Sequence, residues 1–230
     1  MKAPLYLCIH YGFGDYVICY GMVRELAKRH RKIVLFAIPH RSPLHIDNIK
    51  RLYGNIDNVI ISTDDPREYE NVMYIGWVKF NTAVIGGYNL PFANYFYQQA
   101  GVPLNLLWDN FAFERNMDRE REIYYDLLKL KDGDVYDFLH DDPVRNFIIR
   151  KQYIDPTVRT IHLVELEDIS ILDTLLLVER SRKLHTFTTG LVSFIDQMNI
   201  QHPDLNLHQY IRPNTYDQPI LRLNWNIIEK

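Results

Sequence analysis

The sequence contains little cysteine and no long apolar run. Only Cys8 and Cys19 occur among 230 residues, which excludes a disulfide framework. Both lie in apolar surroundings, so we predict two small, buried hydrophobic side chains. No segment reaches the ~18 apolar residues of a membrane-spanning helix, and the first residues lack the apolar region and cleavage site of a signal peptide. We therefore expect a soluble, cytoplasmic protein.

The sequence also lacks a large excess of charge of either sign. The 26 Lys and Arg residues against 29 Asp and Glu residues give a formal net charge of −3. This balance argues against a general nucleic-acid-binding protein, which is normally basic. Hydrophobic residues make up 47% of the chain and aromatic residues 13%, which supplies a packed core and excludes a disordered chain. The length fits one or two small domains.

Short apolar runs alternate with amphipathic segments along the whole chain. Residues 5–9 form a run of strand length, apolar positions at helical spacing follow over residues 17–26, and a second run occupies residues 33–38. This order predicts a β-loop-α-β unit. Further strands are expected at residues 59–62, 72–75, 83–87, 135–139, 147–150, 160–164, 184–187 and 205–210. Further helices are expected at residues 44–53, 92–100, 114–130, 170–180 and 191–198, before a tail that includes Trp225.

The alternation predicts an α/β fold with two Rossmann-like lobes, whose parallel sheets face a central cleft. Residues 101–113 carry the Gly, Pro, Asn and aromatic side chains typical of a connection. We therefore expect a first lobe of residues 1–113 and a second lobe of residues 114–230.

A Gly-rich turn, HYGFGD at residues 10–15, joins the first strand to the first helix. Ligands of open α/β sheets bind at the carboxyl ends of strands, glycine lets a ligand approach the backbone, and a helix N-terminus favours an anion. The turn is not a dinucleotide fingerprint, because Val17 stands where the third Gly would be, and no Gly-Lys-Ser/Thr of a P-loop follows. Two interpretations of Asp15 remain open from the residues alone: an N-cap of the helix or a functional carboxylate.

Several segments together resemble small GT-B-like glycosyltransferases, including heptosyltransferase-type enzymes and compact bacterial and large-DNA-virus relatives. The resemblance rests on H-x-G-x-G-D at residues 10–15, G-x-x-R at 21–24, YQQAGVP at 97–103, FLHDDPVR at 138–145, LHTFTTG at 184–190 and LHQYIR at 207–212. It implies an inverting transferase that uses a nucleoside-diphosphate sugar without a metal, with the acceptor on the first lobe and the donor on the second. Many relatives carry Ser-Ser where this chain has Thr188 and Thr189. The chain is also short for such an enzyme.

The resemblance implies that Asp15 is the general base, and His10 beside it would orient either Asp15 or the acceptor. Residues that bind the donor or its phosphates are expected at Gly12, Gly14, His140, Asp142, Arg145, Glu179, Thr188, Thr189, Gly190 and Arg212. Of these, Arg145, Thr188, Thr189, the N–H groups at Gly190 and Arg212 would stabilise the charge of the leaving diphosphate. Glu179 is expected at the ribose hydroxyls of the donor.

Plain structural roles remain open for several of these residues. Residues 140–143 suit a turn held by Asp side chains, and Glu179 suits an ordinary charge on a helix surface. His185, on a short apolar strand, is expected to be packed rather than to bind a ligand.

Metal chemistry is not expected. Asp132-Gly133-Asp134 has the D-x-D spacing of metal-dependent glycosyltransferases, but its composition between a helix and a strand is typical of a turn. The expected substrates are a nucleotide sugar and a glycan or other hydroxyl acceptor, with no cofactor, no nucleic acid and no membrane span. The alternative functions are a non-catalytic nucleotide- or carbohydrate-binding module and a nucleotide-dependent oxidoreductase.

Overall fold

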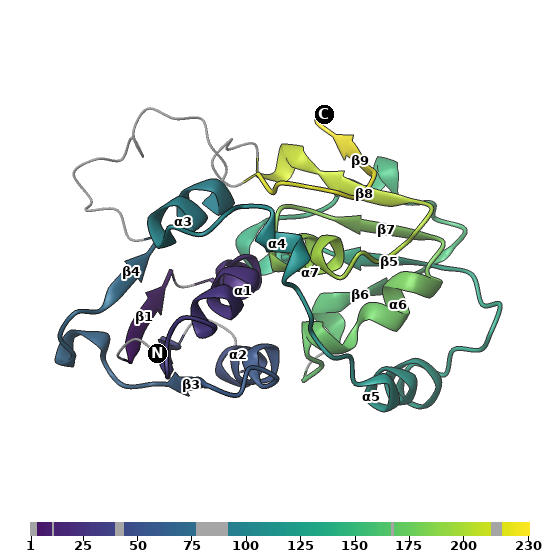
Figure 1. Cartoon of the computed structure of the whole chain (residues 1–230). Helices are drawn as coiled ribbons and strands as arrows, with labels where there is room; N and C mark the ends of the chain where they lie inside the picture. Colours follow the sequence, from purple (N-terminus) through teal and green to yellow (C-terminus); the bar gives the residue numbers. More distant parts are fainter. Residues whose placement is uncertain (1–3, 11, 40–43, 77–91, 167, 213–217) are drawn as a thin grey trace. The chain divides into compact units, whose positions relative to one another are not determined.

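The computed structural model describes residues 4–10, 12–39, 44–76, 92–166, 168–212 and 218–230. The chain divides into two units, Met1–Phe113 with Thr215–Ile220, and Glu114–Asn214 with Leu221–Lys230. Each unit contains its own parallel sheet (Figure 1). The expected α/β fold with two parallel sheets is therefore confirmed, while the acceptor and donor roles assigned to the two lobes stay predictions.

The first unit contains a four-stranded parallel sheet in the order β3-β2-β1-β4. Its elements are β1 (Leu5–Ile9), α1 (Phe13–Ala27), β2 (Ile33–Phe36), α2 (His45–Tyr53), β3 (Val59–Ser62), the 3₁₀-helix η1 (Pro66–Glu68), β4 (Met73–Ile75), α3 (Phe92–Ala100) and α4 (Leu106–Asp109). The strand expected at residues 83–87 lies outside the described residues.

The two inner strands of this sheet have the most apolar sequences. β1 reads LYLCI and β2 reads IVLF, and nearly every residue of both is buried, as expected for parallel strands covered on both faces. One face carries Cys8, Val34 and Phe36, and Tyr69 from the β3–β4 connection packs against them. Helix α1 packs against α2, α3 and α4.

The two cysteines lie in the interior of this unit. Both are fully buried thiols, so the prediction of two small, buried side chains is confirmed. Burial raises the pKa of the Cys19 thiol, and the nearby charge of Asp15 adds to this effect.

Helix α1 begins at Phe13, four residues before the segment in which the apolar periodicity predicted it. Gly12 is the N-cap residue, with φ −78° and ψ 142°. Asp15 therefore lies at the third helical position, and its interpretation as the N-cap is wrong. Its side chain instead accepts a hydrogen bond from the backbone N–H of Gly12 at 3.0 Å, which is the reciprocal half of a capping box.

The G-x-x-R motif at residues 21–24 lies on α1 and contacts the chain around α4. A Cβ atom at Gly21 would overlap the backbone carbonyl oxygen of Leu106, so only glycine permits this close approach. Arg24 donates to the carbonyl oxygen of Asn110 at 3.1 Å. The contacts of this motif are therefore structural.

The second unit contains a five-stranded parallel sheet in the order β6-β5-β7-β8-β9. Its elements are α5 (Met117–Arg121), the π-helical turn η2 (Glu122–Leu127), β5 (Tyr136–His140), η3 (Pro143–Arg145), η4 (Lys151–Tyr153), β6 (Arg159–His162), η5 (Leu163–Glu165), η6 (Ile171–Asp173), α6 (Leu175–Arg180), β7 (Lys183–Thr186), α7 (Gly190–Gln197), β8 (Leu205–His208), η7 (Gln209–Ile211) and β9 (Trp225–Ile228). Across the described parts of both units, no helix combines the length and the apolar character needed to cross a membrane.

Three expectations for this unit are wrong. The single helix at residues 114–130 is a short α-helix followed by a π-helical turn, and the helix at 170–180 begins with a separate 3₁₀ turn. Residues 147–150 form no strand: Phe147 makes one antiparallel bridge, to Asp142, because the chain turns back at once through η3. The tail around Trp225 is a true strand, β9, which pairs in parallel with β8.

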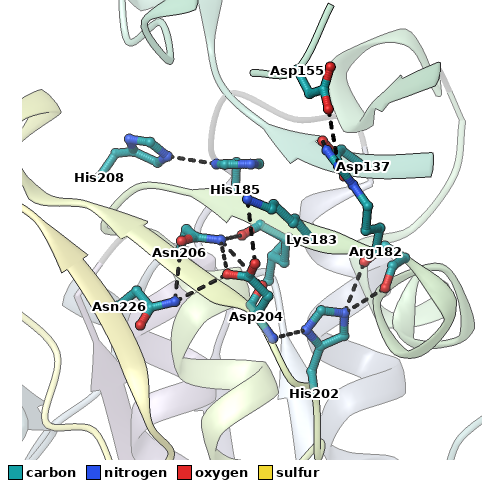
Figure 2. A network of polar contacts seen from close by, with 12 residues as sticks. Asp137, Asp155, Arg182, Lys183, His185, His202, Asp204, Asn206, His208 and Asn226 are labelled. Carbon is teal, nitrogen blue, oxygen red and sulfur yellow. Dashed lines mark hydrogen bonds and ion pairs between the residues drawn. The ribbon is translucent and has the colours of Figure 1, made fainter. Parts of the chain in front are cut away.

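The two faces of the second sheet differ in polarity. Phe138, Leu184 and Leu205 are register partners on one face. Because successive side chains of a strand point to opposite faces, the alternation in YDFLH, KLHT and LNLH puts polar residues on the other. Figure 2 shows this polar face, with Asp137, Lys183, His185, Asn206, His208 and Asn226. Connecting chain covers part of it, since Tyr153 packs against His208.

Candidate functional site

The first candidate group lies at the carboxyl end of β1. Oδ2 of Asp15 accepts two hydrogen bonds, one from Nδ1 of His10 at 3.0 Å and one from the backbone N–H of Gly12 at 3.0 Å. Because an ionised carboxylate only accepts, this pairing places a proton on Nδ1 of His10. The Asp15 side chain is 14% exposed and that of His10 is 43% exposed. The carboxylate is therefore held in place and still reaches solvent.

Glycine at position 12 leaves room for the Asp15 carboxylate. A Cβ atom there would lie 3.1 Å from Oδ2 of Asp15, tighter than ordinary packing. Gly14 lies in the first turn of α1. The structure thus brings His10, Gly12, Gly14 and Asp15 together, as the sequence predicted, while Tyr11 of the same motif lies outside the described residues.

The second candidate group lies at the carboxyl ends of β5 and β7, in the second unit. Nδ1 of His140 lies 3.3 Å from Oγ1 of Thr186 and 3.2 Å from Oγ1 of Thr189. The pKa of His140 is lowered to about 4, chiefly by burial and also by the Arg145 charge, against the opposing effect of Asp142. The His140 side chain is therefore neutral near pH 7. Thr186 is not among the site residues predicted from the sequence.

Thr189 and Gly190 begin helix α7. Thr189 is the N-cap residue, and its own side chain makes no capping hydrogen bond. The first N–H groups of a helix have no partner within it, and together with the helix dipole they favour an anion. Thr188 is buried directly before them, and its carbonyl oxygen accepts a hydrogen bond from Arg212 at 3.1 Å.

Two arginines share one aromatic ring beside this helix N-terminus. The guanidinium carbon of Arg145 lies 4.9 Å from the centroid of the Phe147 ring, and that of Arg212 lies 6.0 Å from it. Nε of Arg145 also donates to Oδ2 of Asp142 at 2.6 Å. Burial alone would raise the pKa of Asp142, but the hydrogen bonds and charge of Arg145 outweigh burial and hold it below its ordinary value. Phe147 is not among the predicted site residues, because its segment was expected to be a strand.

Glu179 belongs to a different cluster. Its carboxylate pairs with Arg115, whose two terminal nitrogens lie 2.6 and 2.9 Å from its oxygens. Arg115 also binds Glu120, which is fully buried and accepts from the backbone N–H of Leu176 at 2.8 Å. The cluster ties α5 to the start of α6. The expected contact of Glu179 with a donor ribose therefore stays a prediction.

The D-x-D segment is a turn, as expected. Oδ2 of Asp134 accepts from the backbone N–H of Lys131 at 2.8 Å, and Asp132 pairs with Tyr125 and Arg180. In the part of the chain that the structure describes, no group of three or more His, Cys, Asp or Glu side chains is arranged to hold a metal ion.

The remaining sequence prediction, that His185 is packed, is confirmed, since this side chain is 2% exposed. It belongs to the polar face of the second sheet and not to the group around His140 (Figure 2).

The two parallel sheets, each with polar groups at the carboxyl ends of its strands, define a GT-B-like α/β protein. A solved structure, the glycosyl transferase family 9 from Veillonella parvula DSM 2008, has a similar fold, with a TM-score of 0.52 over 99% of this chain and 86% of that chain. The two sequences are 9% identical, so the likeness establishes the fold. No family model and no curated protein matches the chain.

Proposed function

We propose that this protein is an inverting glycosyltransferase, which moves a sugar from a nucleoside-diphosphate sugar to a hydroxyl group of a glycan or another acceptor. The observation that carries the proposal is the carboxylate of Asp15, which is fixed by His10 and Gly12 and remains partly accessible. The likeness in fold to a glycosyltransferase supports the same reaction class.

In this mechanism the acceptor oxygen attacks the anomeric carbon while the bond from that carbon to the diphosphate oxygen breaks. The acceptor proton passes to Asp15, and a single displacement inverts the configuration of the sugar. Both described hydrogen bonds to the Asp15 carboxylate use Oδ2, so Oδ1 is the oxygen that takes the proton. A positioned general base contributes ~10²–10⁴-fold to such a reaction.

The leaving diphosphate needs positive charge and N–H donors, and the second unit offers both. Arg145 and Arg212 beside Phe147 would neutralise the phosphate oxygens. The hydroxyl group of Thr189 and the N–H groups at the start of α7 would donate hydrogen bonds to the same oxygens. His140 adds no charge at neutral pH, because its pKa is lowered to about 4 by burial, but its ring orients the Thr189 side chain.

The proposal includes no metal and no cofactor, because arginine side chains and a helix N-terminus supply the charge stabilisation. The nucleotide sugar is the substrate. The cytoplasmic location expected from the sequence stays a prediction.

Asp15→Asn tests the base assignment. The amide oxygen of Asn can still accept from Gly12, so the melting temperature should stay near the wild-type value, but the amide cannot take the acceptor proton. We expect kcat to fall by ~10²-fold or more. Nucleotide affinity should be unchanged, because the donor site is assigned to the other unit. Asp47→Asn, at a side chain that is 71% exposed on α2, is the matched control.

The alternative functions are a binding module and an oxidoreductase. To separate them from a transferase, donor hydrolysis and sugar transfer by the wild-type protein are measured with a panel of UDP, GDP and ADP sugars, and NAD is tested as a further ligand. An Asp15→Asn variant that binds donor and transfers sugar at the wild-type rate would refute the mechanism. Nucleotide binding without hydrolysis or transfer in the wild type would instead indicate a binding module. NAD-dependent absorbance changes would indicate an oxidoreductase.

A further inference from the structure

A backbone hydrogen bond at His10 links the end of β1 to the end of β4. Ile9 and Ile75 are register partners, and the backbone N–H of His10 donates to the carbonyl oxygen of Ile75 at 3.0 Å. The position of the His10 backbone, and with it the imidazole that binds Asp15, therefore depends on where β4 ends.

Gly76, the residue after β4, is packed between two side chains. A Cβ atom at this position would lie 2.9 Å from Cβ of His10 and 2.7 Å from Cε1 of Phe96, both closer than real contacts allow. Gly76 also has a φ of +80°, a conformation that glycine adopts without strain. Glycine is thus the one residue that fits here without displacing His10 or Phe96.

Gln99 holds Gly76 in place from a different element. Its side-chain oxygen Oε1, on α3, accepts a hydrogen bond from the backbone N–H of Gly76 at 2.8 Å. This bond satisfies the backbone N–H of Gly76 at the point where the hydrogen bonds between strands end. A chain of contacts therefore runs from α3 through Gly76 to His10 and Asp15.

We propose that Gly76 and Gln99 are positioning residues, which set the place of the His10 imidazole and through it the orientation of the Asp15 carboxylate. The inference rests on the proposed function, in which Asp15 is the general base. Neither residue contacts Asp15 in the described hydrogen bonds, so both act through His10.

The distances indicate how sensitive the hydrogen bond between His10 and Asp15 is to a displacement of His10. Relieving a contact of 2.9 Å to an ordinary one requires a shift of several tenths of an ångström, and the hydrogen bond from His10 to Asp15 is already 3.0 Å long. Hydrogen bonds weaken beyond ~3.2–3.5 Å. A misplacement of ~1 Å can cost a catalysed reaction ~10²-fold.

Gly76→Ala tests the inference, with Gly101→Ala as the matched control. Gly101 also has a positive φ, +62°, but a Cβ atom there meets nothing within 4 Å. Both variants carry the backbone strain, and only Gly76→Ala presses on His10. We expect kcat to fall at least ~10-fold in Gly76→Ala with the donor KM within about twofold, and Gly101→Ala to stay near the wild-type rate.

Gln99 provides a second pair of variants, which tests the inference even if Gly76→Ala fails to fold. Gln99→Leu removes the acceptor for the Gly76 N–H and should lower kcat. Gln99→Glu keeps an acceptor oxygen and should restore most of the activity that Gln99→Leu loses. Equal losses in both variants would contradict the positioning role.

A spectroscopic readout separates failure of this inference from failure of the proposed function. The side-chain ¹⁵N resonances of His10, assigned with His10→Gln, report its hydrogen bond to Asp15 without any substrate. They should move in Gly76→Ala toward their position in Asp15→Asn, and stay in place in Gly101→Ala. Unmoved resonances in Gly76→Ala overturn the inference. Moved resonances together with full activity of Asp15→Asn support the positioning and overturn the general base.

Discussion

Nδ1 of His185 lies 3.0 Å from Nε2 of His208, inside the second unit (Figure 2). The side chains are 2% and 0% exposed, and among the described residues Nε2 of His185 and Nδ1 of His208 have no hydrogen-bond partner. Burial lowers the pKa of His208 to about 3, and His185 beside it contributes to the same effect. Burial also lowers the pKa of His185. The pair is therefore neutral near pH 7.

Other charged and aromatic groups surround the pair. The rings of Tyr153 and Tyr210 meet the His208 ring edge to face, at centroid distances of 5.1 and 5.5 Å. The charges that act on His185 are those of Asp137, Arg182, Lys183 and Asp204; the carboxylates raise its pKa and the cations lower it, with a smaller effect than burial. Acidification therefore forces protons onto two buried rings whose burial disfavours the charged form.

The first prediction concerns acid stability. The folded state binds a proton at His208 only near pH 3, whereas the unfolded chain binds one near 6.5. Between these values the unfolded state holds more protons, so the free energy of unfolding falls as the pH falls, by up to ~1.4 kcal/mol per pH unit for each such group. Denaturant unfolding of the wild type between pH 7.5 and 4.5 should show this decline.

His208→Gln, which has no titrating ring, should flatten that decline even if it lowers stability at pH 7.5. His30→Gln, at a partly exposed side chain of the first unit, serves as the control and should keep the wild-type slope. A wild-type slope in His208→Gln would show that the acid sensitivity arises elsewhere.

A second prediction concerns the donor site. Nucleoside diphosphate should stabilise the wild type by ~2.7 kcal/mol at a hundredfold excess over Kd. Arg145→Ala should weaken binding by roughly 10–100-fold, because a hydrogen bond to a charged group contributes ~1.5–3 kcal/mol. Isothermal titration calorimetry measures the difference. Arg121→Ala, at a side chain that is 61% exposed on α5, is the control, and equal affinities of the two variants would remove Arg145 from the site.

The third prediction addresses metals. Asp132 and Asp134 are engaged in turn contacts with Tyr125, Arg180 and Lys131, so EDTA should leave the transfer rate within about twofold of its value in Mg²⁺. The double variant Asp132→Asn/Asp134→Asn should transfer at a similar rate. Loss of activity in EDTA that Mn²⁺ restores would assign the protein to the metal-dependent class.

The fourth prediction concerns Asp196, which anchors the C-terminal strand. Its buried carboxylate accepts from the backbone N–H groups of Arg222 at 3.0 Å and Leu223 at 2.9 Å, and from Nε1 of Trp225 at 3.3 Å. Asp196→Ala leaves several donors unpaired, at ~1–3 kcal/mol each, so we expect a loss of at least ~2 kcal/mol in unfolding free energy.

Hydrogen exchange at the amides of Arg222 and Leu223 should accelerate in Asp196→Ala. The exposed Asp126 in η2 offers a matched Asp→Ala control, which should change neither stability nor exchange. Protection of both amides at wild-type levels in Asp196→Ala would show that the Asp196 carboxylate does not hold this segment.

Local sequence patterns predicted most strands and helices. The apolar runs at residues 5–9 and 33–38 became β1 and β2, and helix α3 has the bounds expected from the stop at Gly101 and Pro103. These elements were predictable because periodicity, glycine and proline act within a few residues of one another. Strand β9 was not predictable in this way, because it depends on pairing with β8. The failure at residues 147–150 is local: the chain turns back through η3, and Phe147 pairs with Asp142.

The sequence by itself determined the two α/β units and the Gly-rich turn that holds Asp15 near His10, because a strand, a turn and a helix that follow one another bring their own side chains together. Only the tertiary structure decided that Gly76, held by Gln99, packs against His10, and that the guanidinium groups of Arg145 and Arg212 both lie over the Phe147 ring. The physical reason is that these neighbours are set by sheet order and register, and by the loops that follow each strand. Both result from packing the whole unit, and no short stretch of residues encodes them.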